Sequence, residues 1–192
     1  FWRGQHWYRS LFPTVITKYV LRKRLKKKVM VLDTSPTCFL HPFAASRIKK
    51  LLPNVKMIIL FRNPIDHAYS LYHHRVRMKS EILTFEDAIK EDKQRFIETE
   101  NKWINDEVRE YNWKYLRLSY LSDGIYINHI DKWYSLFPKE NICCLDIDKL
   151  KDQKVFFNEI FKFLGVDEDK ISDYIKYNTS NEKNNQNNTE NN

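Results

Sequence analysis

The chain has 192 residues, of which 42% are hydrophobic and 15% aromatic, and its formal net charge is +8. This length and composition predict one folded domain with a substantial core, and the charge favours anionic partners such as nucleotides, phosphates or sulfated polymers. The sequence shows no arginine-rich repeat, no metal-ligand or CxxC spacing and no apolar run long enough to cross a bilayer, so nucleic-acid binding, a metal site and a spanning helix are not expected.

The first third of the sequence predicts two helices and then a strand. Residues 1–13 are expected to form a short helix that ends at a proline, and residues 14–27 a basic amphipathic helix. The apolar side of this second helix is predicted to carry Val15, Tyr19 and Val20. The run VMVLD at 29–33 predicts a short buried strand, which is followed by a turn-rich loop and a helix over 43–52.

The remaining elements alternate between strands and helices. The run KMIILF predicts a second strand, covered on both faces because its apolar character is unbroken. The further expected elements are a helix from Pro64, a polar helix within 84–115, a helix within 121–138, a strand at 141–147 and a helix over 152–166 that ends at Gly165. Residues 178–192 are Asn-rich and lack apolar side chains, which predicts a disordered tail.

This alternation indicates an α/β fold with a central parallel sheet. Ligands of such sheets bind at the carboxyl ends of the strands. Asp33 and Arg62 stand at two such ends, so both are candidate site residues.

The segment RNPIDHAYSLYHH at 62–74 places Arg62 between a strand and a helix. Asn63 and Pro64 are favourable residues for the start of a helix, and the N–H groups of a helix start attract anions. The guanidinium of an arginine also matches the geometry of a phosphate. This junction therefore predicts an anion-binding site.

The helix that follows has a polar stripe, formed by His67, Ser70 and His74 at i, i+3 and i+7. The opposite face is predicted to pack on the sheet through Ile65, Tyr69, Tyr72 and Val76. Spacing alone leaves two interpretations open: the stripe is the solvent side of an amphipathic helix, or it belongs to a binding site. The Lys/Arg run at 21–28 is open in the same way, as a solvated helix face or as a guide for an anionic polymer.

The segment RNPIDHAYSLYHH resembles the 3′-phosphate-binding segment of the sulfotransferases that use 3′-phosphoadenosine 5′-phosphosulfate (PAPS), in which Arg-x-Pro-x-x-Arg-x-x-Ser follows a strand. Further stretches resemble the same family in the same order: RGQHWYRSLFP, LDTSPTCFLHPFAASRIKKLLPNVKMIILFRNP, DGIYINHIDKWYSLFPKENICCLDIDKL and FNEIFKFLGV. The resemblance covers about residues 3 to 166. It implies a three-layer, P-loop NTPase-like fold and a sulfotransferase domain over residues 1–177.

The resemblance also implies roles for individual residues. Arg62 and Ser70 would hold the 3′-phosphate of PAPS, and His74 matches a histidine near the reaction centre in the heparan N-sulfotransferase branch. Asp33 and Tyr126 are weaker candidates for contacts with the substrate, and Tyr126 is expected either to pack in the fold or to border the cofactor. The implied reaction transfers a sulfuryl group to a hydroxyl or amine, on a carbohydrate or another anionic acceptor, without a metal. The implied location is the Golgi or secretory lumen, in a type II membrane protein whose anchor lies outside this chain.

Three departures from the family pattern affect these expectations. The first strand and the phosphosulfate-binding loop of the family are absent, so the fold is expected to be N-terminally incomplete, with these parts and the general base upstream of Phe1. His67 replaces the second arginine of the motif, and Asp33-Thr34 replaces Glu-Lys. The chain alone is therefore expected to bind PAPS poorly. A nucleotide-dependent phosphotransferase and a non-catalytic anion-binding module remain open as alternatives.

Overall fold

The computed structural model describes residues 4–26, 29–105, 118–148 and 153–166. The chain divides into two compact units, Phe1–Ile147 and Asp148–Asn192. The predicted tail at 178–192 and the end of the predicted polar helix beyond residue 105 lie outside the described residues.

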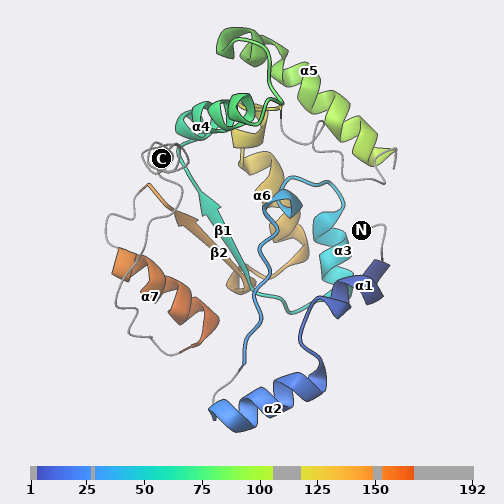
Figure 1. The fold of residues 1–192 in the computed structure, drawn as a ribbon, viewed down its shortest axis with the longest axis vertical. Coiled ribbons are helices and arrows are strands. Elements are labelled where there is room, and N and C mark those ends of the chain that lie inside the picture. The colour runs from blue at the N-terminus through green and yellow to red at the C-terminus, as the bar shows by residue number, and fades with distance from the viewer. Residues whose placement is uncertain (1–3, 27–28, 106–117, 149–152, 167–192) are drawn as a thin grey trace, which may run out of the picture. The chain divides into compact units, whose positions relative to one another are not determined.

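Two parallel strands organise the first unit. Strands β1 (Met57–Phe61) and β2 (Ile142–Asp146) lie side by side (Figure 1), with Met57 opposite Ile142 and Phe61 opposite Asp146. The N–H of Ile147 extends the ladder by donating to the carbonyl of Phe61 at 2.9 Å. The prediction of a parallel sheet is thus confirmed, and the carboxyl ends of both strands share one edge.

The prediction of a strand at 29–33 is wrong. Described residues 29–35 form no strand, and the side chain of Leu32 is 74% exposed. A short apolar run becomes a strand when a neighbouring strand supplies hydrogen-bond partners and covers its side chains. Within the part of the chain that the structure describes, the sheet contains β1 and β2, and this run does not pair with either.

One face of the sheet carries the first hydrophobic core. Helices α3 (Ala44–Leu51) and α6 (Ile127–Leu136) pack together there, and alternate side chains of β1 contact them. The buried members of this core are Ala44, Ala45, Ile130, Trp133, Phe137 and Ile142. On the other face Leu60 is 52% exposed, so the prediction that both faces of this strand are covered is wrong at that residue.

A second core lies between α4 (Pro64–Arg77), α5 (Phe85–Ile104) and the segment that starts at Leu118. Its buried members are Ala68, Ala88 and Tyr120. The prediction that Ile65, Tyr69, Tyr72 and Val76 of α4 pack on the sheet is wrong, because Ile65 is 74% exposed and Tyr69 and Val76 are also exposed. Tyr72 packs against the second core instead, while Ala68 and Arg75 are buried. The reason is that α4 packs against α5, the segment that starts at Leu118 and the 3-10 turn η2 (Ser122–Gly124). These elements contact a different stripe of the helix.

Helices α1 (Gly4–Ser10) and α2 (Val15–Leu25) confirm the two helices predicted at the start of the chain. The expected apolar side of α2 is solvent-exposed, since no residue of this helix is buried. Two further 3-10 turns, η1 (Pro36–Cys38) and η3 (Lys139–Asn141), lie in the loops before α3 and β2.

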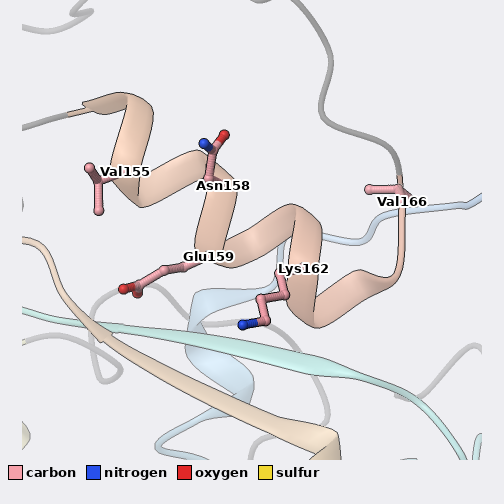
Figure 2. Close-up of a pocket in the computed structure, with 5 residues that line it drawn as sticks. All are labelled: Val155, Asn158, Glu159, Lys162 and Val166. Atoms are coloured by element: carbon pink, nitrogen blue, oxygen red, sulfur yellow. The ribbon is translucent and has the colours of Figure 1, made fainter.

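The second unit contains helix α7 (Gln153–Leu164), which ends as predicted at Gly165. Gly165 has φ +69°, and the N–H of Val166 donates to the carbonyl of Phe161 at 3.1 Å. This is the Schellman arrangement, which favours glycine because a side chain is strained at positive φ. Figure 2 shows a hollow along this helix, lined by Val155, Asn158, Glu159, Lys162 and Val166. One helix and its C-terminal turn form its lining, and none of the predicted site residues is among them.

His41 is expected to make the stability of the first unit depend on pH. Its ring stacks on Trp103 at 5.1 Å, and its Nδ1 accepts the N–H of Phe43 at 3.1 Å. Burial, followed by the charge of Arg47, lowers the pKa of His41 from 6.5 to about 4. Because the unfolded chain takes up the proton first, stability is complete above pH 6.5 and decreases as the pH falls toward 4.

His41→Asn keeps an acceptor near the position of Nδ1 but does not titrate. In urea denaturation, we expect the wild-type chain to lose about 1 kcal/mol more than the variant between pH 7 and pH 5, after allowance for screening by water. Equal pH dependence of the two proteins would contradict this assignment.

Candidate functional site

Arg62 is the first residue after β1 and precedes the N-cap of α4. Figure 1 shows this junction between the carboxyl end of β1 and the start of α4. The hydroxyl of Tyr126 donates to the backbone carbonyl of Arg62 at 3.2 Å. The ring of Tyr126 also packs against Phe61, with 4.7 Å between the ring centroids. The backbone that carries the Arg62 side chain is therefore fixed by a residue from the start of α6.

The N-terminal amides of α4 already have acceptors. The Oδ1 of Asn63 accepts from the N–H of Ile65 at 2.9 Å and from the N–H of Asp66 at 3.5 Å, and the carbonyl of Asn63 accepts from His67 at 2.9 Å. Pro64 has no N–H to offer. The expectation that free amides at this helix start bind an anion is wrong, because the N-cap satisfies them. An anion here must be bound by side chains.

The polar stripe on α4 begins close to Arg62. Ser70 and His74 are exposed, whereas His67 is half-buried and its Nδ1 is buried without a hydrogen-bond partner. Burial, and then the positive charge of Arg62, lowers the pKa of His67 from its usual value. His67 is therefore neutral at pH 7, and the guanidinium of Arg62 provides a positive charge at this end of the stripe. Ser70 lies about 9 Å further along the helix axis than Pro64.

The two weaker candidates occupy structural positions. Both carboxylate oxygens of Asp33 accept hydrogen bonds, from the Tyr8 hydroxyl at 2.7 Å and from the Ser35 hydroxyl at 3.1 Å. Burial and the Asp33 carboxylate together raise the pKa of Tyr8, so this phenol stays a donor. Asp33 thus ties its loop to α1, and Tyr126 holds the Arg62 carbonyl. Their predicted contacts with an acceptor remain predictions.

Asp92, a buried carboxylate that the sequence did not reveal, stabilises the backbone segment that packs next to the site. Asp92 on α5 accepts hydrogen bonds from the N–H of Tyr120, from Leu121 at 2.9 Å, and from the N–H and hydroxyl of Ser122 at 3.0 and 2.6 Å. The segment held in this way leads to Gly124, where an added Cβ would stand 3.0 Å from the Cβ of Pro64. Asp92 therefore positions η2 against the start of α4.

A second buried carboxylate stabilises the same region. Glu81 accepts from Arg95 at 2.6 Å and from the Tyr120 hydroxyl at 2.8 Å, and also from the N–H groups of Ile82 and Leu83. Burial alone would raise the pKa of Glu81, but these donors, Arg95 first among them, hold it below its usual value. Glu81 remains ionised at neutral pH and joins α5 to the segment that Asp92 holds.

The side chains at this edge of the sheet suit an oxyanion. A guanidinium with five donors, a hydroxyl and an imidazole lie along one helix and its N-terminal junction, and they can donate hydrogen bonds to phosphate or sulfate oxygens. With the helix amides engaged by Asn63, side chains and not backbone amides are the groups available to an anion at this junction. Among the residues that the structure describes, no helix is both long and apolar enough to cross a membrane.

Comparison with known proteins places this arrangement in a family. The family model described as "Sulfotransferase domain" matches residues 7–192. Bifunctional heparan sulfate N-deacetylase/N-sulfotransferase 1 of Caenorhabditis elegans is 28% identical over 181 residues, which are 93% of this chain and 18% of that protein. Heparan sulfate glucosamine 3-O-sulfotransferase 3B1 of Homo sapiens is 23% identical over 165 residues, or 85% of this chain and 36% of that protein. The chain thus spans well under half of either relative.

The fold is also similar to a solved structure. A sulfotransferase from Alicyclobacillus acidocaldarius superposes with a TM-score of 0.52 at 24% identity, over 72% of this chain and 52% of that one. At this identity the similarity concerns the fold alone, a mixed α/β arrangement with a small parallel sheet in the described part of this chain. The family implies PAPS as the sulfuryl donor. Since the family model covers nearly the whole sequence, the chain belongs to the sulfotransferase domain family.

Proposed function

We propose that the protein containing this chain is a PAPS-dependent sulfotransferase that modifies a hydroxyl or amine of a carbohydrate. The observation that carries the proposal is the position of Arg62, at the carboxyl end of β1 and at the head of a stripe with Ser70 and His74. Membership of the family supports the reaction class. Relatives named for N- and 3-O-sulfation of heparan sulfate support a carbohydrate acceptor, with either an amine or a hydroxyl as the nucleophile.

Arg62 and Ser70 are proposed to hold the 3′-phosphate of the donor. When bound, PAPS supplies a sulfuryl group on a good leaving phosphate. The guanidinium provides charge-assisted hydrogen bonds and Ser70 provides one neutral donor, so Arg62 contributes more of the affinity than Ser70. Tyr126 and Asp92 act through the backbone, because one holds the Arg62 carbonyl and the other holds the segment that packs on Pro64.

His74 is proposed to act nearer to the reacting atoms. Its exposed imidazole lies one helical turn beyond Ser70, on the same stripe of α4. An N–H of this ring can stabilise negative charge on the sulfuryl oxygens or orient the acceptor group. The finer architecture of three layers around a P-loop NTPase-like sheet, and a Golgi luminal location, are parts of the same proposal and rest on the family resemblance of the sequence.

Sulfate transfer from radiolabelled PAPS to a heparan-type oligosaccharide tests the proposal. Ser70→Ala should raise the KM for PAPS about tenfold, because one hydrogen bond to a charged group is lost. His74→Ala should lower kcat about 100-fold with little change in that KM.

The matched control is His73→Ala, which removes the neighbouring imidazole from the same helix. This ring packs edge-to-face against Tyr69 and Tyr72, away from the stripe, so kcat should stay within a factor of about two. Normal transfer by both the Ser70 and the His74 variants would show that this stripe is not the site.

A further inference from the structure

The positive charge of the chain is concentrated at one end of the sequence. Residues 1–32 contain nine Lys and Arg and no Asp or Glu, so this segment carries +9 and residues 33–192 together carry −1. The net charge of +8 is therefore a property of this segment, and helix α2 is its centre. A field of one sign concentrated in this way attracts polyanions and accelerates their association.

Among the residues that the structure describes, the cations of α2 have no acidic partners, and all are exposed except the half-buried Lys18. Arg22, Lys23 and Arg24 fill the last turn, with Lys18 one turn earlier and Lys26 at the C-cap. None of the five forms an ion pair with a carboxylate of the described residues. Within the described residues, the Lys23 ammonium makes a cation–π contact and lies 5.0 Å from the centre of the Tyr19 ring.

This helix is stabilised by its ends and not by packing. Thr14 caps its N-terminus by accepting the N–H of Thr17 at 3.1 Å, and no side chain of the helix is buried. An isolated helix of 11 residues is marginal in water. Lys18 and Arg22 stand at i and i+4, where like charges repel and destabilise a helix. A bound polyanion would remove this repulsion and stabilise α2.

The distribution of side chains around α2 favours a linear polyanion over a membrane surface. Helices that lie in membranes separate a continuous apolar face from a basic one. On α2 the apolar and the basic side chains are mixed. Arg22 lies seven residues after Val15 and so interrupts the apolar face that Val15 and Tyr19 begin. Such a helix presents cations around most of its circumference, which suits a flexible charged chain better than a flat bilayer.

We propose that α2 is a docking surface for the acceptor of the reaction, and that the acceptor is a linear sulfated or carboxylated polysaccharide. This rests on the proposed function, because it makes the docked polymer the substrate. The surface is separate in sequence from the donor site at Arg62, so the two can be tested independently.

The experiment compares two triple variants of equal net charge. Arg22→Ser/Lys23→Ser/Arg24→Ser removes the last turn of cations from α2. Lys50→Ser/Lys93→Ser/Lys139→Ser removes three exposed cations dispersed over α3, α5 and η3. Binding of a size-fractionated heparin oligosaccharide is measured by calorimetry from 50 to 300 mM salt. Circular dichroism with and without the oligosaccharide reports the helix content.

We expect the α2 variant to bind the heparin oligosaccharide at least about tenfold more weakly than wild type. The slope of log Kd against the logarithm of the salt concentration should be smaller by about 2 in this variant. The control variant should lose less than threefold. Wild-type helix content should rise on binding, and the rise should be absent in the α2 variant. Equal losses in the two variants would overturn the proposal, since net charge and not α2 would then be responsible.

Two further measurements distinguish a failure of the proposed docking surface from a failure of the proposed function. Tighter binding of wild type to phosphatidylserine vesicles than to the oligosaccharide, lost in the α2 variant, would assign the surface to a membrane and overturn the proposal. Binding of adenosine 3′,5′-bisphosphate should be unchanged in the α2 variant. If that nucleotide does not bind to wild type while heparin still binds through α2, the proposed function fails and the docking surface stands as a polyanion site without that reaction.

Discussion

Replacement of Arg62 by alanine is expected to weaken the binding of adenosine 3′,5′-bisphosphate about 100-fold. The guanidinium provides charge-assisted hydrogen bonds to the 3′-phosphate, and two such bonds contribute about 3 kcal/mol together. The amides of α4 cannot compensate, because Asn63 and the helix itself already satisfy them. Calorimetry on the protein that contains this chain measures the change.

Two companion variants make this result specific. Arg62→Lys keeps the charge but loses the planar fork, so an intermediate loss of about tenfold is expected. Arg77→Ala removes an exposed cation from the last turn of the same helix and should leave the affinity within about twofold. Equal affinity of wild type and Arg62→Ala would remove this residue from the donor site.

Replacement of Asp92 by alanine is expected to lower the free energy of unfolding by about 3 to 5 kcal/mol. Asp92 is 3% exposed, and its two oxygens accept four hydrogen bonds from residues 120–122. Alanine would leave those backbone donors without acceptors in a buried region, and each such donor costs about 1 to 3 kcal/mol, with partial relief from water. Urea denaturation followed by tryptophan fluorescence measures the loss.

The same variant should also affect the donor site. Because Gly124 packs on Pro64, a displaced 120–124 segment should weaken nucleotide binding even where the protein is still folded. Asp92→Asn retains one acceptor oxygen and should be less destabilising than alanine. Asp131→Ala, at an exposed acid on α6, should change stability by less than about 0.5 kcal/mol. A loss below 1 kcal/mol for Asp92→Ala would mean that water replaces the carboxylate.

The sequence was sufficient for elements whose signals are local. The N-cap at Asn63, the proline that follows it and the glycine at the end of α7 each act within one turn of the chain, and the structure places them as predicted. The parallel sheet was also predictable, because strands and helices alternate along the chain. These features depend little on what the segments later contact.

The errors arose where a distant partner decides the outcome. The strand predicted at 29–33 needs a neighbouring strand, and the buried face of α4 is set by α5 and η2, which come later in the sequence. Asp92 stands among charged residues and reads as solvated, and only its position four residues after Ala88 places it on the buried face. Arg62 was predicted from its junction, whereas the engagement of the helix amides follows from geometry that the sequence does not give.

The register of the sheet has a consequence for how the protein is made. Met57 pairs with Ile142, so β1 must wait for a partner 85 residues further along the chain. At ribosomal rates of roughly 5 to 20 residues per second, that wait is about 4 to 17 seconds of synthesis. During this interval the apolar run Met57–Phe61 has left or is leaving the ribosome without β2. Such a nascent chain is a natural client for the chaperones that shield unpaired strand edges during translation.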